Sequence, residues 1–342
     1  MDLFTLTRTL VDIESVTNNE KQIAEFLFNY LSKLAQPQHG NVERMQVDSS
    51  RFNVFASWGR PIVTLSTHMD TVPPFFPSRE DDGFLWGRGA CDAKGIIGAM
   101  LLAAAELLAD GVSGFALLFV VGEEHGSAGA CAAAKVSRGS RYLVNGEPTE
   151  NKVAIASKGV LRFELKAQGR LAHSAYPELG QSAIESLLDV LQQIRALALP
   201  QDPILGETTM NIGTISGGRA HNVIADEARA EISIRLVGDA APIRCAIRRI
   251  TENRVQAVEV LHTPVSRLSN FDGLPTTVVA FASDIGALGT SWGIPFLIGP
   301  GSIHVAHTAG EFVSKRELRD AVTIYSQMVR RLLSEKATES KS

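Results

Sequence analysis

Short apolar segments alternate with segments of helical periodicity along much of this 342-residue chain, and this alternation constrains its fold more than any other feature. Residues 53–57, 62–66 and 115–121 are apolar runs of strand length, whereas residues 94–108 have helical periodicity. Strands that alternate with helices are typical of an α/β layer fold with a buried, largely parallel sheet. We therefore predict an α/β domain of this kind.

A different pattern interrupts the alternation between residues 158 and 265. It has the order strand, helix, strand, strand, helix, strand, which is typical of a ferredoxin-like α+β unit. The six segments are residues 160–167, 182–197, 208–215, 228–237, 242–253 and 256–261. Helical periodicity resumes at residues 274–288. We predict one domain made of residues 1–157 and 266–342, with residues 158–265 inserted as a second domain.

Composition and charge exclude several classes of protein. With 33 Lys and Arg against 37 Asp and Glu, the net charge of −4 provides no basic field for nucleic acid or anionic lipid. No apolar run approaches the roughly 18 residues of a membrane-spanning helix. The three cysteines form no CxxC pair, which excludes a thiolate zinc site and suits a reducing compartment. We expect a folded cytoplasmic protein that binds neither nucleic acid nor membranes.

Histidine and acidic residues gather in glycine-rich stretches that follow the predicted strands. His68 and Asp70 come soon after the apolar run at 62–66. Residues two apart on extended backbone share a face, so one side chain can bind a metal while the other supports it. Taken alone, however, a histidine near an aspartate is more often structural.

Asp92 lies in the glycine-rich stretch 87–95, at the start of the predicted helix 94–108. A dinucleotide-binding fingerprint needs glycine at the position of Asp92, so this stretch does not fit a Rossmann nucleotide site. A carboxylate at a helix start can either cap the helix or bind a metal. The local sequence leaves both roles open.

Glu123 and Glu124 follow the most apolar of the predicted strands. Two adjacent carboxylates are costly to bury unless a cation neutralises them or one of them keeps its proton. The pair therefore indicates one metal ligand and one general base. Ser127 is one residue out of register for the G-x-S-x-G motif, which argues against a serine hydrolase.

Two further motifs complete the set, with Glu147 after the apolar run 142–144 and His307 in the glycine-rich loop 298–311. In this order, the motifs resemble those of the M20 family of metallo-aminoacylases and peptidases. The resemblance covers nearly the whole chain. It implies a zinc-peptidase-like α/β catalytic domain that binds metal, and an inserted ferredoxin-like domain that acts in dimerisation or as a lid.

The resemblance also implies two Zn²⁺ ions, for which Co²⁺ can substitute, and five metal ligands. His68 and Glu147 would bind one ion, Glu124 and His307 the other, and Asp92 would bridge the two. Imidazole and carboxylate groups are suitable zinc ligands, and a bridging carboxylate suits two ions about 3.5–4 Å apart.

Other roles around the metals follow from the same resemblance. Glu123 would be the general base, and Asp70 would hold the imidazole of His68 from behind. The peptide bond between Asp92 and Ala93 would be cis. The chain also departs from the family, because Ala309 and Gly310 stand where relatives usually have an acidic residue after the last ligand.

Four residues are expected to contact the substrate. His173 and Asn222 in the insertion match family motifs that stabilise the oxyanion, and in relatives this histidine acts on the active site of the partner subunit. Without the resemblance, His173 would be read as a turn residue. Arg235 would bind the substrate α-carboxylate, assisted by backbone N–H groups around Gly301. A homodimer through the insertion is therefore expected.

The function expected first is a dinuclear zinc amidohydrolase acting on a small N-acyl amino acid. The run Gly299-Pro300-Gly301-Ser302-Ile303 resembles acetylornithine deacetylase most closely. A succinyl-diaminopimelate desuccinylase, or a dipeptidase or carboxypeptidase of the same family, is the nearest alternative. An alternative of another class is a catalytically silent metal-binding scaffold. Glu123 counts against the scaffold, because a binding protein has no need of a second carboxylate beside a ligand.

Overall fold

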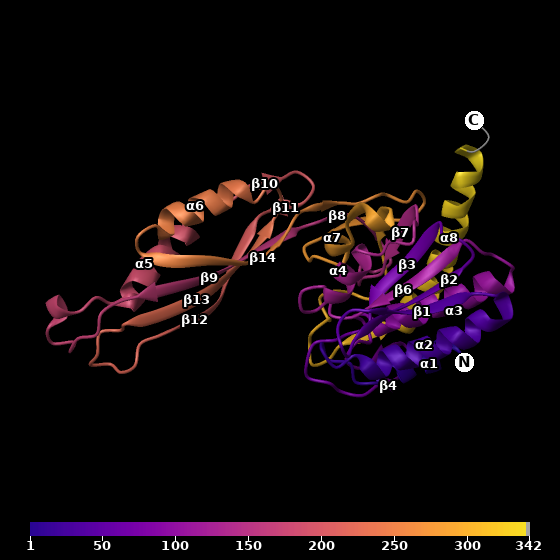
Figure 1. Ribbon diagram of the computed structural model, residues 1–342, viewed down its shortest axis with the longest axis horizontal. Helices are drawn as coiled ribbons and strands as arrows, with labels where there is room; N and C mark the ends of the chain where they lie inside the picture. The colour runs from indigo at the N-terminus through magenta and orange to yellow at the C-terminus, as the bar shows by residue number, and fades with distance from the viewer. Residues whose placement is uncertain (340–342) are drawn as a thin grey trace. The chain divides into compact units, whose positions relative to one another are not determined.

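A nine-stranded mixed sheet, most of whose strands belong to the first of two units, is the largest sheet in this computed structural model, which describes residues 1–339 (Figure 1). Unit 1 comprises Met1–Ile155, Leu268–Thr277 and the chain from Ser283 onward, and unit 2 comprises Ala156–Arg267 and Val278–Ala282. The predicted boundaries, 157/158 and 265/266, each lie two residues from the boundaries of these units. Residues 278–282 also belong to unit 2, whereas the sequence placed them in the first domain.

The large sheet has the strand order β1-β2-β6-β3-β7-β17-β8-β15, and β16 also pairs with β8. Its centre is parallel, because β3 pairs in parallel with β6 and β7, and β17 pairs in parallel with β7. The strands are β1 (Asn41–Gln46), β2 (Phe52–Trp58), β3 (Val63–His68), β6 (Phe115–Val120), β7 (Tyr142–Asn145), β8 (Val153–Ser157), β15 (Ser266–Arg267), β16 (Thr276–Val279) and β17 (Ile294–Leu297). The predicted α/β fold with a largely parallel central sheet is therefore confirmed.

Helices pack against this sheet and enclose the core of unit 1. They are α1 (Leu3–Val11), α2 (Lys21–Ala35), α3 (Lys94–Ala109), α4 (Ala128–Ala134), α7 (Ile285–Leu288) and α8 (Lys315–Glu339), with single 3₁₀ turns at Gln36–Gln38 and Gly289–Trp292. One continuous apolar core joins α1, α2, α3 and α8 to the sheet. Helix α3 is apolar on almost every side, as expected of a helix that is buried all round.

A small antiparallel sheet of three strands joins two segments that are far apart in the sequence. It consists of β4 (Arg79–Glu80), β5 (Phe84–Trp86) and β18 (Phe312–Ser314), in the order β18-β5-β4. The rings of Phe84, Trp86 and Phe312 pack together across it, with centroid distances of 4.7–6.0 Å. This sheet joins the segment before Asp92 to the segment after His307.

Unit 2 contains a four-stranded antiparallel sheet in the order β12-β13-β9-β14. Its elements are β9 (Gly159–Gln168), a 3₁₀ turn (Pro177–Leu179), α5 (Ala183–Arg195), the short pair β10 (Gln201–Asp202) and β11 (Gly206–Glu207), β12 (Thr209–Gly217), β13 (Glu227–Leu236), α6 (Ala241–Thr251) and β14 (Val255–Thr263). Alternate residues of β9 and β13 pack against α5 and α6 in a separate apolar core. This is the predicted ferredoxin-like order, with a small hairpin added.

One predicted element is wrong. Residues 274–288 were expected to be helical, but the structure has β16 at Thr276–Val279 and only a short α7 at Ile285–Leu288. All four residues of β16 are Thr or Val, and such β-branched residues favour strands. The pairing of β16 with β8 then fixes the strand.

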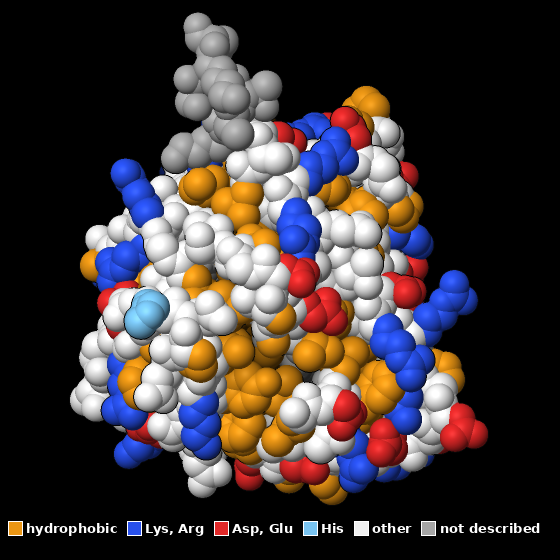
Figure 2. Space-filling view, turned by 90° about the vertical axis from the view of Figure 1, so that its right-hand side faces the viewer, with side chains coloured by type: hydrophobic (Ala, Val, Ile, Leu, Met, Phe, Trp, Pro, Cys, Tyr) orange, Lys and Arg blue, Asp and Glu red, His pale blue; other side chains and the backbone are white. Residues whose placement is uncertain are grey.

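Surface charge and helix composition add two further observations. On the face drawn in Figure 2, basic and acidic side chains are interspersed. Among residues 1–339, no helix is both long enough and apolar enough to cross a membrane.

Candidate metal centre and active site

Parallel strands carry the candidate site residues to one edge of the large sheet. His68 is the last residue of β3, and it lies in register with Val120, the last residue of β6. Glu123 and Glu124 follow β6, and Glu147 follows β7. Because the carboxyl ends of parallel strands meet at the same edge, segments that are far apart in the sequence converge there.

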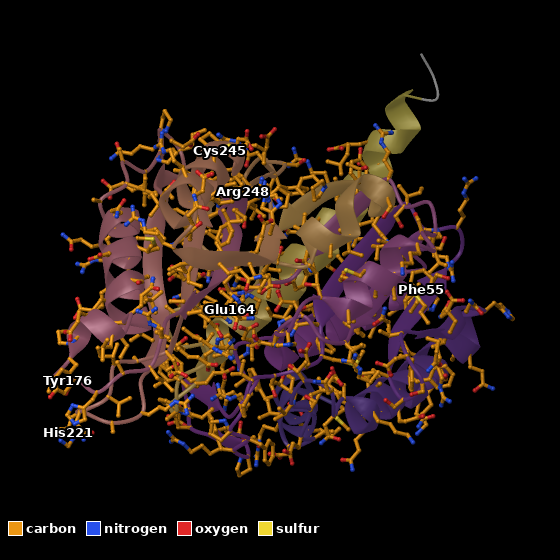
Figure 3. The ribbon with its side chains drawn as sticks, turned by 60° about the vertical axis from the view of Figure 1, so that its left-hand side comes forward. Phe55, Glu164, Tyr176, His221, Cys245 and Arg248 are labelled. Carbon is orange, nitrogen blue, oxygen red and sulfur yellow. The ribbon has the colours of Figure 1, made fainter. Side chains whose placement is uncertain are left out.

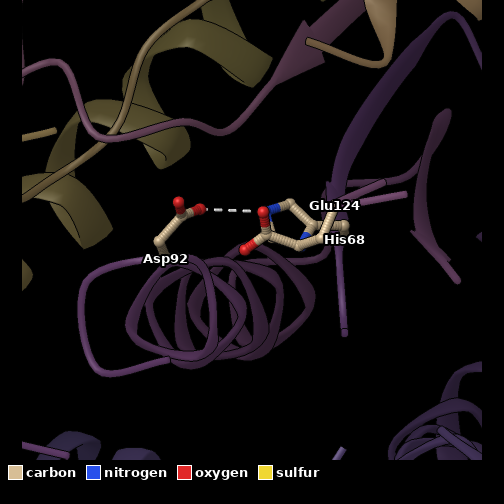
Figure 4. A group of neighbouring side chains, drawn as sticks. All are labelled: His68, Asp92 and Glu124. Carbon is tan, nitrogen blue, oxygen red and sulfur yellow. Dashed lines mark hydrogen bonds and ion pairs between the residues drawn. The ribbon is translucent and has the colours of Figure 1, made fainter. Parts of the chain in front are cut away.

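His68 and Asp92 form the centre of the cluster (Figure 4). The imidazole Nε2 of His68 lies 2.9 Å from Asp92 Oδ1, and both side chains are buried. His68, Asp92 and Glu124 each offer a ligand atom, and these atoms lie within 4.8 Å of one another. The peptide bond between Asp92 and Ala93 is cis, as the family resemblance predicts.

His307 adds a fourth member to this cluster. Its Nε2 lies 2.9 Å from the Glu124 carboxylate and 3.4 Å from Asp92 Oδ2. Asp92 is therefore the carboxylate that contacts both histidines, one through each of its oxygens. Asp92 thus lies between the two candidate histidine ligands.

Asp70 has a wider role than the sequence indicated. Its carboxylate lies 3.5 Å from His68 Nδ1, but it accepts closer hydrogen bonds from the backbone N–H groups of Glu123 (3.0 Å) and Glu124 (3.2 Å). It also accepts a hydrogen bond of 2.8 Å from the hydroxyl of Thr17, a residue that sequence reasoning missed. Asp70 therefore supports the turn that carries both glutamates as well as the histidine.

Burial and crowding of charge shift the pKa values of these groups. Burial, followed by the neighbouring charges of other carboxylates, raises the pKa of Glu123 and of Glu147 well above the ordinary value. Hydrogen bonds with Asp92 and Glu124 raise the pKa of His307 to about 10. Burial opposes ionisation of Asp92, but hydrogen bonds with His307 and His68 hold its pKa below the ordinary value.

These residues fit a pair of divalent cations. Glu147 is buried, and its Oε1 has no hydrogen-bond partner among the described residues, so a group outside the polypeptide is needed to satisfy it. The donor set contains two imidazoles and three carboxylates, which are ligands that zinc accepts. The crowded acids would also be neutralised by such ions.

The Gly301 prediction is not supported by this structure. The N–H of Gly301 donates to Glu317 Oε2 at 2.9 Å, so it is not free to bind a substrate carboxylate. A Cβ atom at this position would lie 2.5 Å from the Sγ of Cys91, and the φ angle is +85°. The glycine is therefore required by close packing of the loop against Cys91.

His173 and Asn222 are brought together in unit 2. A backbone bridge links His173 to Val223, and the N–H of Ser174 donates to the carbonyl of Asn222 at 3.0 Å. Both residues are exposed. Figure 3 shows Tyr176 and His221, which belong to the same two loops, at one end of this unit.

Arg235 lies at the opposite end of the same sheet. It pairs with Val160 near the start of β9, whereas the loop with His173 follows Gln168 at the end of that strand. The eight residue steps from Val160 to Gln168 span about 26 Å at about 3.3 Å per residue. Within one copy of unit 2, Arg235 and His173 therefore cannot contact the same small molecule.

Comparison with known proteins agrees with these observations. The family described as peptidase family M20/M25/M40 matches residues 64–331. A peptidase M20 domain-containing protein of Schizosaccharomyces pombe is 37% identical over 96% of this chain and 84% of its own length. A probable carboxypeptidase of Aspergillus flavus is 34% identical over 94% of this chain and 85% of its own length.

A solved structure has the same fold at low sequence identity. It is a dinuclear metal binding peptidase of the M20 family from Bacillus subtilis, with a TM-score of 0.68 and 16% identity. The match covers 97% of this chain and 98% of that one.

Proposed function

Because the chain belongs to the M20 family of peptidases, we propose that it is a dinuclear metal hydrolase that releases an amino acid by cleaving the amide bond at its nitrogen. The observation that carries this proposal is the contrast between the two adjacent glutamates. Glu124 contacts His307 at 2.9 Å, whereas no side-chain hydrogen bond holds the Glu123 carboxylate among the described residues. Glu123 is therefore left available for proton transfer.

His68, Asp92, Glu124, Glu147 and His307 would hold two Zn²⁺ ions, with Co²⁺ able to substitute. When bound, such ions supply positive charge and Lewis acidity at the scissile carbonyl. Glu123 would accept the proton of the attacking water and pass it to the departing amine. Its raised pKa suits a group that must both take and return a proton. Asp70 would keep Glu123 in place through the backbone of the turn.

The proposed substrate carries a free α-carboxylate on the side of the leaving amine. Arg235 on β13 is half-buried, and a guanidinium group suits such a carboxylate. Two classes of acyl group remain candidates. The loop around Gly301 resembles that of acetylornithine deacetylase, which favours a small acyl group. The relative in Aspergillus flavus is called a probable carboxypeptidase, which favours a peptide instead.

We propose that the enzyme is a homodimer through unit 2 and that His173 and Asn222 act on the partner's substrate. This follows from the separation of Arg235 and His173 along β9, since one copy cannot bring both to one small molecule. Strand β12 is an edge of its sheet and has free backbone groups for pairing. Ile215 on β12 and Leu188 on α5 are 55% and 49% exposed, and they would be covered in such a dimer.

A cytoplasmic location is proposed as well, since all three cysteines are free.

The scaffold alternative predicts metal binding without turnover. Glu123 argues against it, because no side-chain hydrogen bond among the described residues accounts for a second carboxylate beside Glu124.

The proposal is tested with a panel of acetyl-, succinyl-, formyl- and aminoacyl-amino acids, together with short peptides, assayed by amine release with added zinc. Exhaustive chelation should abolish hydrolysis, and zinc or cobalt should restore it. Cleavage of acetyl-amino acids alone would select the deacetylase, and release of C-terminal residues from peptides would select the carboxypeptidase. Full activity in protein shown to be metal-free by elemental analysis would contradict the proposed dependence of hydrolysis on metal.

A further inference from the structure

A buried ion pair lies directly behind the loop that carries Asp92. Arg88 Nη1 and Glu311 Oε2 are 2.6 Å apart, and each side chain is 1% exposed. Arg88 also donates from Nε to the carbonyl of Pro74 at 3.2 Å, and its guanidinium lies over the ring of Phe76. Because both charges are out of water, this pair is held in one geometry by its surroundings.

The second oxygen of the same carboxylate holds the backbone at Asp92. Glu311 Oε1 accepts hydrogen bonds from the N–H of Cys91 at 3.0 Å and from the N–H of Asp92 at 3.1 Å. The Glu311 carboxylate thus fixes the peptide unit from which the Asp92 side chain extends toward His68 and His307.

Glu311 is also close in sequence to another candidate ligand. It stands four residues after His307 and directly before β18. The pairing of β18 with β5 continues into the hydrogen bond from the N–H of Gly87 to the carbonyl of Glu311, at 3.1 Å. The loop of Asp92 and the loop of His307 are therefore joined through both the backbone and the side chain of Glu311.

We infer that Glu311, neutralised by Arg88, is a positioning residue that sets the distance between Asp92 and His307 and so determines metal affinity at the bridged site. In the sequence, Ala309 and Gly310 stand where relatives usually have an acidic residue after the last ligand. The structure assigns the position to Glu311, whose carboxylate reaches the loop of Asp92 from the residue directly before β18. Groups that orient metal ligands typically change metal affinity 10- to 100-fold when they are lost.

The inference rests on the proposed metal centre, and it is tested by metal titration of the intact, metal-free protein. Zn²⁺ affinity is measured by competition with a chromophoric chelator, and Co²⁺ binding by visible absorption. Glu311→Gln should weaken the binding of at least one of the two metal equivalents about 10- to 100-fold and change the Co²⁺ spectrum. Glu43→Gln is the matched control, since Glu43 pairs with Arg138 at 2.6 Å on the surface of the same unit.

A second variant separates positioning from folding, because Glu311→Gln leaves Arg88 buried without its counter-charge. In the double variant Arg88→Met with Glu311→Leu, both charges are replaced by apolar groups of similar size, a change that folded proteins often tolerate. This variant should stay folded without metal, with a lower melting temperature because the N–H groups of Cys91 and Asp92 lose their acceptor, and it should lose metal affinity like Glu311→Gln.

The outcomes distinguish the inference from the proposed function. Native metal affinity and a native Co²⁺ spectrum in either folded variant would overturn the role of Glu311 and leave the metal centre standing. Failure of the native chain itself to bind two ions would instead overturn the proposed function.

Discussion

At Glu123 and Glu124, neighbouring backbone N–H groups donate to the same carboxylate, that of Asp70, so the two side chains leave one fixed turn. Only Glu124 then meets a histidine. We expect Glu123→Gln to retain both metals but lose about 10²–10⁴-fold in turnover, because the proton acceptor is gone. Glu124→Gln should lose metal as well. Metal content by elemental analysis and kcat on the best substrate give the two readouts.

This assignment has a clear contrary result. If both variants lose metal equally while remaining folded, the base and the ligand have been assigned wrongly. Asp81→Asn serves as a control for the loss of a turn-supporting acid, since Asp81 accepts backbone hydrogen bonds from Gly83 and Phe84 in a surface turn. It should leave both metal content and kcat unchanged.

Asp284 is a second residue for which the structure makes a prediction. It is 1% exposed, and neither of its carboxylate oxygens has a hydrogen-bond partner among the described residues. Burial raises its pKa from 3.8 to about 7. Between about pH 4 and pH 7 the folded chain therefore holds a proton that the unfolded chain releases, so a rise in pH through this interval lowers the free energy of unfolding.

Asp284→Asn should remove this dependence. The free energy of unfolding of the variant minus that of the native chain should increase from pH 4 to pH 7, by up to a few kcal/mol, and stay level above pH 7. Chemical unfolding of the metal-free proteins at several pH values measures the difference. Asp82→Asn, at an exposed position in the same unit, is measured alongside as the control. A flat profile for Asp284→Asn would mean that Asp284 is ionised throughout.

The sequence identified the candidate metal-site residues more completely than the groups that support them. His68 ends β3, Glu124 and Glu147 follow β6 and β7, and a strand end is visible as the end of an apolar run. Thr17 and Glu311 act through hydrogen bonds to segments more than 50 residues away, at Asp70 and Asp92. Such contacts depend on the tertiary fold and leave no local pattern. For the same reason, the occupied N–H of Gly301 could not be foreseen.

Among the elements, α3 shows how close packing decides the residue at a helical position. A Cβ atom on Gly98 would lie 2.6 Å from the Oγ1 of Thr7 on α1, and that hydroxyl already donates to the carbonyl of Leu3. Gly98→Ala should therefore lower stability by about 1–2 kcal/mol, because the overpacking exceeds the gain in helix propensity of about 1 kcal/mol. Thermal and chemical unfolding measure the change.

The double variant Thr7→Ala with Gly98→Ala removes the obstructing hydroxyl and is the matched control. It should recover most of the loss, since alanine at both positions favours helix and relieves the contact. If Gly98→Ala alone were more stable than the native chain, α1 would be free to move away from α3, and the packing argument would fail.

Elements were predictable where periodicity was long and regular. The four long strands and two helices of unit 2 follow the expected order. Strands β9 and β13 and helices α5 and α6 each bury an apolar face in one core, which β12 and β14 join through only a few residues. The helix prediction for residues 274–288 failed because a short apolar run does not distinguish strand from helix. There the pairing of β16 with β8, which is a tertiary contact, decides the structure.

For the whole molecule, the decisive prediction concerns subunit exchange. His173→Ala and Glu123→Gln should each be nearly inactive, and mixing them under exchange conditions should recover up to about a quarter of native activity. Half of the dimers are then mixed, and each contains one site with both residues intact if His173 acts in the partner. Exchange is verified with differently tagged chains. No recovery despite exchange would place His173 in its own subunit's site or leave the insertion as a lid.

The opposite placement of Arg235 and His173 along β9 also bears on how the enzyme responds to its own concentration. If a working site is assembled from two chains, the monomer is inactive. Specific activity should then fall on dilution below the dissociation constant of the dimer and return when the protein is concentrated again. Hydrolytic activity would then rise more steeply than linearly with the concentration of the protein. A cell that makes little of the protein would therefore have almost no activity.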